Sequence, residues 1–218
     1  MNKMIKDTLI LFLITLIAGL GLGVVYNVTK DARAEQEEKT KIAAYKEVMP
    51  EMADYEEVKV VNVADVLTFV KKKNKDIESK NHITPIKAFN ANIDEIVCAK
   101  NSAGEEIGYI VTVTDQEAYG GSLQMTVGIL KDRTVKGISF LTLKETPGLG
   151  MKAKEDAFKK QFQNKKVEYF AYSKTGAVKD NEIDAISSAT ITSNAVTHGV
   201  NAAVYSVDYL LEQTKEGE

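Results

Sequence analysis

The hydrophobic positions of the chain fall into one long uninterrupted run and several short alternating runs. The long run, residues 8–26, contains no charged residue and would span roughly 28 Å as a helix, close to the thickness of a bilayer core. A cleaved signal peptide is the alternative, since Lys3 and Lys6 precede the run and residues 32–34 (Ala-Arg-Ala) resemble a cleavage site. The run is too long for a signal core and the site lies far beyond its end. The apolar run therefore predicts a transmembrane anchor over residues 8–26, with residues 1–7 as a short tail.

The segment that follows the anchor, residues 27–50, is rich in Ala, Glu and Lys. Glu37 and Glu38 precede Lys41 by four and three positions, which is the spacing of stabilising pairs on a solvated helix. Pro50 cannot continue a helix. We therefore expect a juxtamembrane helix here and a folded domain over residues 51–218.

Alternating apolar and polar positions in the middle of the chain predict β-strands joined by short turns. Residues 51–90 show no clear period, and the run Lys71-Lys72-Lys73 is interpreted as a solvated turn or a helix end. Strands in the middle with helices on both sides predict an α+β domain on a mostly antiparallel sheet. The expected strands are residues 95–100, 107–114, 123–130, 135–143 and 167–172, and the expected helices are residues 156–162 and 193–211, the latter with Val196, Val200, Ala203, Val207 and Leu210 on one face.

Composition narrows the function classes. The chain has 218 residues, of which 44% are hydrophobic and 27% charged, as in a globular domain. Its net charge of −3, with both signs interspersed, makes nucleic acid an improbable partner. Cys98 is the only cysteine and His82 and His198 the only histidines. This inventory predicts no metal site and no disulfide, and Cys98 is expected to be buried.

Two segments contain residues that their predicted secondary structure does not explain. The first, residues 145–150 (Glu-Thr-Pro-Gly-Leu-Gly), follows a strand, and its Pro-Gly pair is typical of a type II turn. A turn alone does not explain Glu145 or the second glycine, Gly150. Small residues on both sides of Leu149 would allow a flat ligand to lie against the backbone.

The second segment, residues 184–193, is rich in Ser and Thr and precedes the last predicted helix. Thr192 or Ser193 is interpreted as the helix N-cap. One capping hydroxyl would be sufficient, however, and the segment has several. Free amides and a partial positive charge at a helix N-terminus suit a phosphate group, which a nearby hydroxyl could hold by hydrogen bonds or through an ester bond.

Ser188-Ala189-Thr190, preceded by Asp184 and followed by Thr192 and Ser193, resembles the flavinylation motif of the covalent FMN-binding domain family. The segment 145–150 and the Tyr119-Gly120-Gly121 turn are similar to that family in order and spacing. With the anchor and this length, the whole chain most resembles the G-subunit family of the Rnf ion-translocating electron-transport complex. The commoner motif has Gly where this chain has Ser188, which we expect to narrow access to Thr190 slightly.

The resemblance implies that the phosphate of FMN is esterified to Thr190 by a flavin transferase, which would make the chain a covalent flavoprotein and phosphoprotein. It implies no catalytic side chain, because the cofactor carries the chemistry. Leu149 and Tyr119 would contact the ring, and Thr146 with nearby amides would bind its polar edge. The remaining cofactor-binding residues implied are Gly120, Gly121, Ser122, Glu145, Gly148, Lys152, Ser187, Ser188, Ala189, Ile191 and Thr192.

The resemblance also implies a setting. The chain would be the flavin-bearing electron relay of a membrane complex that transfers electrons between ferredoxin and NAD, coupled to sodium-ion or proton movement. Its partners would be other membrane and iron–sulfur subunits in a bacterial or archaeal cell (inner) membrane, with one span and the flavin domain on the extracytoplasmic side. Counting Lys and Arg around the span favours the opposite orientation. The alternatives are the C-type subunit of the sodium-translocating NADH:quinone oxidoreductase and a membrane-tethered binding or assembly module without redox activity.

Overall fold

The computed structural model describes residues 3–58, 62–81, 83 and 86–216, and the chain divides into two compact units, Met1–Ile42 and Ala43–Glu218. All described residues of the first unit belong to one α-helix, α1 (Lys3–Val48). The last residues of this helix belong to the second unit. The apolar run forms its first half and is long enough to cross a membrane. The helix continues through the Ala/Glu/Lys-rich segment and ends before Pro50, as predicted.

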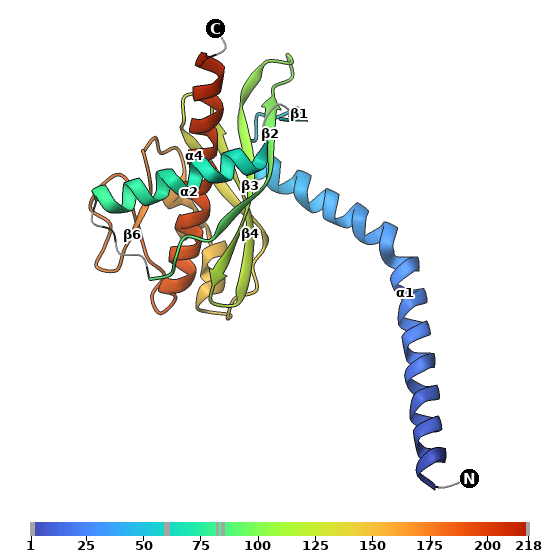
Figure 1. The fold of residues 1–218 in the computed structure, drawn as a ribbon. Helices are drawn as coiled ribbons and strands as arrows, with labels where there is room; N and C mark the ends of the chain where they lie inside the picture. The colour runs from blue at the N-terminus through green and yellow to red at the C-terminus, as the bar shows by residue number, and fades with distance from the viewer. Residues whose placement is uncertain (1–2, 59–61, 82, 84–85, 217–218) are drawn as a thin grey trace. The chain divides into compact units, whose positions relative to one another are not determined.

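The second unit is built on a five-stranded antiparallel sheet whose strands are neighbours in sequence order. The four alternating runs in the middle of the chain form its strands as predicted, and a short edge strand precedes them (Figure 1). This arrangement confirms the predicted α+β class. The strands are β1 (Asp54–Glu57), β2 (Ala91–Lys100), β3 (Glu106–Ala118), β4 (Gly121–Leu130) and β5 (Val135–Thr142).

Side chains alternate between two covered faces of this sheet. On one face, Val97 and Ile110 pack against Tyr45 and Val48 from the end of α1. A Cβ atom on Gly128 would lie 2.4 Å from the carbonyl oxygen of Val48, so a glycine is required where this helix end crosses β4. The last turn of α1 is therefore part of the folded unit.

The opposite face carries the main hydrophobic core beneath α4 (Thr190–Glu216), which packs against the central strands (Figure 1). The predicted apolar face of this helix is confirmed, since all five of its residues are buried. The helix begins at Thr190, three residues before the predicted start. A second helix, α2 (Val63–Lys80), packs against α4 and contains Lys71-Lys72-Lys73 in its interior, so their interpretation as a turn or helix end is wrong.

Short elements connect β5 to α4. They are a 3₁₀ turn η1 (Gly150–Lys154), α3 (Asp156–Lys159), a second 3₁₀ turn η2 (Lys160–Phe162), and the parallel pair β6 (Ala171–Ser173) and β7 (Glu182–Asp184). The strand predicted over residues 167–172 is wrong except at its end. The amide of Phe170 donates to Asn201 Oδ1 at 2.7 Å and its carbonyl accepts from Asn201 Nδ2 at 2.9 Å. The side chain of Asn201 thus makes the backbone hydrogen bonds that a neighbouring strand would otherwise make.

Candidate functional site

A cavity of about 510 Å³ lies where the turn after β3, the segment after β5 and the start of α4 meet. It brings together nine of the residues that the sequence predicts to bind a cofactor, although they belong to three separate segments. Gly150, the unexplained second glycine of the turn motif, also lines it. The lining residues are Tyr119, Glu145, Thr146, Leu149, Gly150, Ser188, Ala189, Thr190, Ile191 and Thr192.

The segment 145–150 forms the predicted turn. The amide of Leu149 donates to the carbonyl of Thr146 at 3.1 Å, and Gly148 has a φ of +76°, as the third residue of a type II turn requires. Leu149 remains 41% exposed. The turn therefore presents an apolar side chain to the cavity instead of burying it in the core.

Glu145 links the segment after β5 to the turn after β3 through a hydrogen bond. Its side chain is buried, and its Oε1 atom accepts the amide N–H of Gly120 at 3.2 Å. A Cβ atom on Gly120 would lie 1.8 Å from the carbonyl oxygen of Lys144, so only glycine allows this approach. The carboxylate thus holds the turn that carries Tyr119, whose ring is 72% exposed.

The start of α4 forms the other wall. The first helical bond runs from the amide of Ser193 to the carbonyl of Ala189 at 3.0 Å, so the amides of Thr190, Ile191 and Thr192 have no partner within the helix. The first turn contains no acidic residue. The free amides at this end of α4 therefore suit an anion, and Thr190 is the half-buried first residue of the helix.

The capping interpretation of Thr192 and Ser193 is wrong. The Ser193 hydroxyl accepts from the amide of Ile186 at 2.9 Å and donates to the carbonyl of Ala189 at 3.1 Å, which braces the preceding loop. Thr192 is fully buried, and its Oγ1 atom has no hydrogen-bond partner among the described residues. A buried hydroxyl without a partner on a cavity wall indicates a ligand or solvent partner.

Ser188 adopts a left-handed backbone conformation, with a φ of +62°. Glycine adopts this conformation without the steric penalty that a Cβ atom brings. The glycine that is common at this position of the motif is therefore explained by backbone conformation. The Ser188 side chain is exposed, so its main consequence is strain in the loop that precedes Thr190.

Six predicted binding residues do not line the cavity. Gly120 and Gly121 belong to the turn that carries Tyr119, and Gly121 has a φ of +101° there. Gly148 belongs to the turn that carries Leu149. The other three, Ser122, Ser187 and Lys152, have side chains outside the cavity lining.

The lining fits a flavin mononucleotide. Its volume lies in the range of small-molecule sites, two exposed apolar side chains at Tyr119 and Leu149 suit a ring, and the helix terminus suits a phosphate. No group of three or more potential metal ligands occurs among the described residues. The apolar rim and the helix terminus together suit an organic anion with an aromatic part.

Comparison with known proteins agrees with this geometry. The profile of the FMN-binding domain matches residues 118–205, a span that contains the whole cavity lining, and the profile of the RnfG N-terminal region matches residues 1–48. The chain is therefore a membrane-anchored protein with an FMN-binding domain.

Two relatives match almost the whole chain. The G subunit of the Na(+)-translocating ferredoxin:NAD(+) oxidoreductase complex of Acetobacterium woodii is 32% identical over 91% of this chain and 89% of that protein. The G subunit of the ion-translocating oxidoreductase complex of Methanosarcina acetivorans is 29% identical over 97% of both chains. The chain belongs to the RnfG family, the G subunits of the Rnf complex.

More distant matches follow. The C-type subunit of the Na(+)-translocating NADH-quinone reductase of Pasteurella multocida is 35% identical, but over only 50% of this chain and 44% of that protein. The crystal structure of NqrC from Shewanella oneidensis is 20% identical, with a TM-score of 0.47 over 56% of this chain and 61% of that chain. This structural likeness is too weak to assign a function.

Proposed function

We propose that the chain is the flavin-bearing electron relay of a membrane complex that transfers electrons between ferredoxin and NAD and couples this transfer to movement of sodium ions or protons. The observation that carries the proposal is the cavity between Leu149 and Thr190, because it joins an apolar rim to a free helix terminus. The name of the Acetobacterium woodii relative supports ferredoxin and NAD as the two electron-transfer partners.

FMN is held in this cavity by an ester between its phosphate and the Thr190 hydroxyl. Thr190 is the first residue of α4, so the remaining phosphate charge lies beside the amides of that helix. Tyr119 and Leu149 contact the ring, while Thr146 and Thr192 supply hydrogen-bonding hydroxyls. The bound flavin supplies the redox chemistry, and the protein provides position and electrostatic environment.

A covalent bond is useful in a cavity of this shape. Leu149 and Tyr119 are exposed at the rim, so a ring that contacts them remains accessible to redox partners but is held weakly. A tether keeps the flavin at a high effective concentration regardless of that weak contact. Formation of the ester requires a flavin transferase and an activated donor of the FMN phosphoryl group. As the bond from phosphorus to Thr190 Oγ1 forms, the bond to the leaving group of the donor breaks and the hydroxyl loses its proton.

The membrane topology is also a proposal. We infer one transmembrane span, with Lys3 and Lys6 in the cytoplasm and the flavin domain on the extracytoplasmic side of a cell membrane. Protease added to intact spheroplasts should then digest an affinity tag placed after Glu218. Full protection of that tag, with digestion only after lysis, would reverse the orientation.

Assembly and activity test the relay directly. A tagged chain should purify with other membrane and iron–sulfur subunits, and the purified complex should reduce NAD with reduced ferredoxin. Thr190→Val should assemble in equal amount but lose this activity. Quinone reduction by NADH in place of ferredoxin-dependent activity would indicate the NADH:quinone oxidoreductase alternative. Full activity of the unflavinylated variant would indicate a binding or assembly module.

A further inference from the structure

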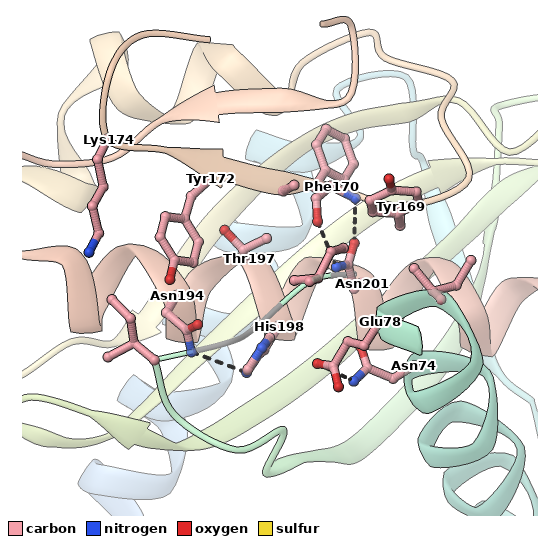
Figure 2. A pocket seen from close by; sticks show the side chains of 14 residues that line it. Asn74, Glu78, Tyr169, Phe170, Tyr172, Lys174, Asn194, Thr197, His198 and Asn201 are labelled. Carbon is pink, nitrogen blue, oxygen red and sulfur yellow. Dashed lines mark hydrogen bonds between the residues drawn. The ribbon is translucent and has the colours of Figure 1, made fainter. Parts of the chain in front are cut away.

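A second cavity, of about 300 Å³, lies between α2, α4 and the segment that leads into β6. Figure 2 shows Asn194 and His198 side by side on α4, with Tyr172 and Phe170 across from them and Asn74 and Glu78 on α2. None of its lining residues belongs to the cavity at Thr190. It is therefore a separate feature of the domain.

Asn194 and His198 form the polar part of its lining. The amide nitrogen of Asn194 lies 3.3 Å from His198 Nδ1 and donates to it, because an amide nitrogen cannot accept. Asn194 is fully buried, yet its Oδ1 atom has no partner among the described residues. A neutral imidazole that accepts at Nδ1 carries its proton at Nε2, which also has no partner in the described part of the chain.

The other buried polar side chains of the lining are occupied by the fold. Asn201 binds the backbone of Phe170 through both ends of its amide. Thr197 donates to the carbonyl of Ser193 at 2.8 Å, and Asn74 donates to Glu78 at 2.9 Å. Asn194 and His198 therefore differ from these buried neighbours, since each has one hydrogen-bonding atom without a partner in the described part of the chain.

The two free atoms are one acceptor and one donor, and both belong to neutral groups. Burial lowers the pKa of His198 to about 4, so the imidazole is uncharged near neutral pH. A charged ligand would lose its hydration without an opposite charge on these two residues. The lining has two charged residues, the exposed Lys174 and Glu78, whose carboxylate accepts from Asn74. The rest of the wall is largely aromatic and aliphatic, with Ile77, Tyr169 and Phe170 among its residues, which suits a flat apolar body.

We propose that this cavity is a second binding site, which takes a small, uncharged, planar molecule through a carboxamide or lactam edge. The ligand N–H donates to Asn194 Oδ1, and its adjacent carbonyl accepts from His198 Nε2. The ring of the ligand lies among Ile77, Tyr169 and Phe170. The site is independent of the flavin at Thr190.

Two simple probes test the site with the full-length protein in detergent. Benzamide has the required edge, whereas methyl benzoate has the same ring and carbonyl without an N–H. The chain contains two histidines, so ¹⁵N-histidine labelling gives a simple spectrum in which His198 is assigned by substitution. Benzamide should shift the ring nitrogens of His198 saturably, and methyl benzoate should bind about tenfold more weakly.

Substitutions then distinguish a binding site from a structural contact. Asn194→Leu keeps the size but removes the free acceptor, and it should abolish benzamide binding while the protein remains folded. Thr197→Val is the matched control, because the Thr197 hydroxyl is used within α4. It should bind benzamide as the wild type does, and so should Thr190→Val.

Three results would overturn the proposal. Equal binding of both probes would show an apolar cavity without recognition of an amide. Undiminished binding by Asn194→Leu would place the probe elsewhere. No saturable shift with either probe would show that the cavity holds only water. If Asn194→Leu fails to fold, the ratio of the two probe affinities in the wild type still decides the matter.

Discussion

Gly150 lies directly against Thr192, since a Cβ atom on Gly150 would come within 2.7 Å of Thr192 Oγ1 and within 2.6 Å of Glu145 Oε2. This contact joins the turn motif to the start of α4, although the two are far apart in the sequence. A side chain here must displace both the buried carboxylate and the buried hydroxyl. The glycine therefore determines how closely the two walls of the cavity approach.

The first prediction follows from this contact. Gly150→Ala should lower the free energy of unfolding by about 1–3 kcal/mol through overpacking and should reduce the flavin content of the purified protein. Gly137→Ala is the matched control, because a Cβ atom there meets nothing within 4 Å. Denaturant unfolding and flavin absorbance measure both effects. Equal behaviour of the two variants would show that the contact does not constrain the site.

The second prediction concerns the strained residue before Thr190. Ser188→Gly should raise the free energy of unfolding by about 1 kcal/mol, because glycine adopts a φ of +62° without steric penalty. Ser187→Gly is the control, since Ser187 is equally exposed but is not in the left-handed region. The midpoints of denaturant unfolding measure the difference. A Ser188→Gly protein less stable than the wild type would contradict the strain argument.

The third prediction uses a buried carboxylate on β3. Burial raises the pKa of Asp115 to about 6, from an ordinary value near 4. Between these values the folded protein binds more protons at this group than the unfolded chain does. This contribution to stability is therefore lost as the pH rises from about 4 to about 6, by up to about 3 kcal/mol.

Asp115→Asn removes this titration while leaving an oxygen to accept the amide of Glu117, which now donates to Asp115 at 2.8 Å. The stability of the variant relative to the wild type should rise between pH 4 and pH 6 and then remain level. Parallel denaturant titrations at each pH cancel the contributions of other groups. A difference that is constant across pH 4–8 would contradict the raised pKa.

The fourth prediction separates the tether from the ring contact. Leu149→Ala should leave the flavin attached, because the ester at Thr190 is independent of this side chain, while removing an apolar contact worth about 1–3 kcal/mol. The ring should become more mobile, so flavin fluorescence should be brighter and less polarised. Val178→Ala, at a side chain that is 91% exposed and outside the cavity, should change neither. Unchanged fluorescence with a lower unfolding free energy would show that Leu149 packs against the protein and not against the ring.

Local pattern was sufficient to predict most of the sheet. Strands such as β3 and β4 alternate along their length and are joined by turns with clear residue signatures. The helix α2 was missed although its buried residues Val66, Val70, Asn74 and Ile77 have helical spacing, because the three lysines in its interior obscure the pattern. Asn62, whose side chain accepts the amide of Ala64, was the other available signal.

The remaining differences depend on contacts between distant residues. The strand predicted over residues 167–172 forms only at its end because Asn201 binds the backbone of Phe170, and no local pattern reveals this. The first residue of α4 depends on Ser193 bonding back to Ile186 instead of capping. The two motifs of the cavity were recognisable individually, but the fit of Gly150 against Thr192 required the folded structure.

The most direct test of the central claim is mass spectrometry of the chain purified from its native membrane. Tryptic cleavage after Lys179 yields the peptide that contains all the hydroxyls of the motif. The account predicts that this peptide carries the mass of FMN less one water, that fragmentation places it on Thr190, and that Thr190→Val lacks it. An unmodified peptide from the natively expressed protein, or a flavin on Ser187, Ser188 or Thr192, would contradict the claim.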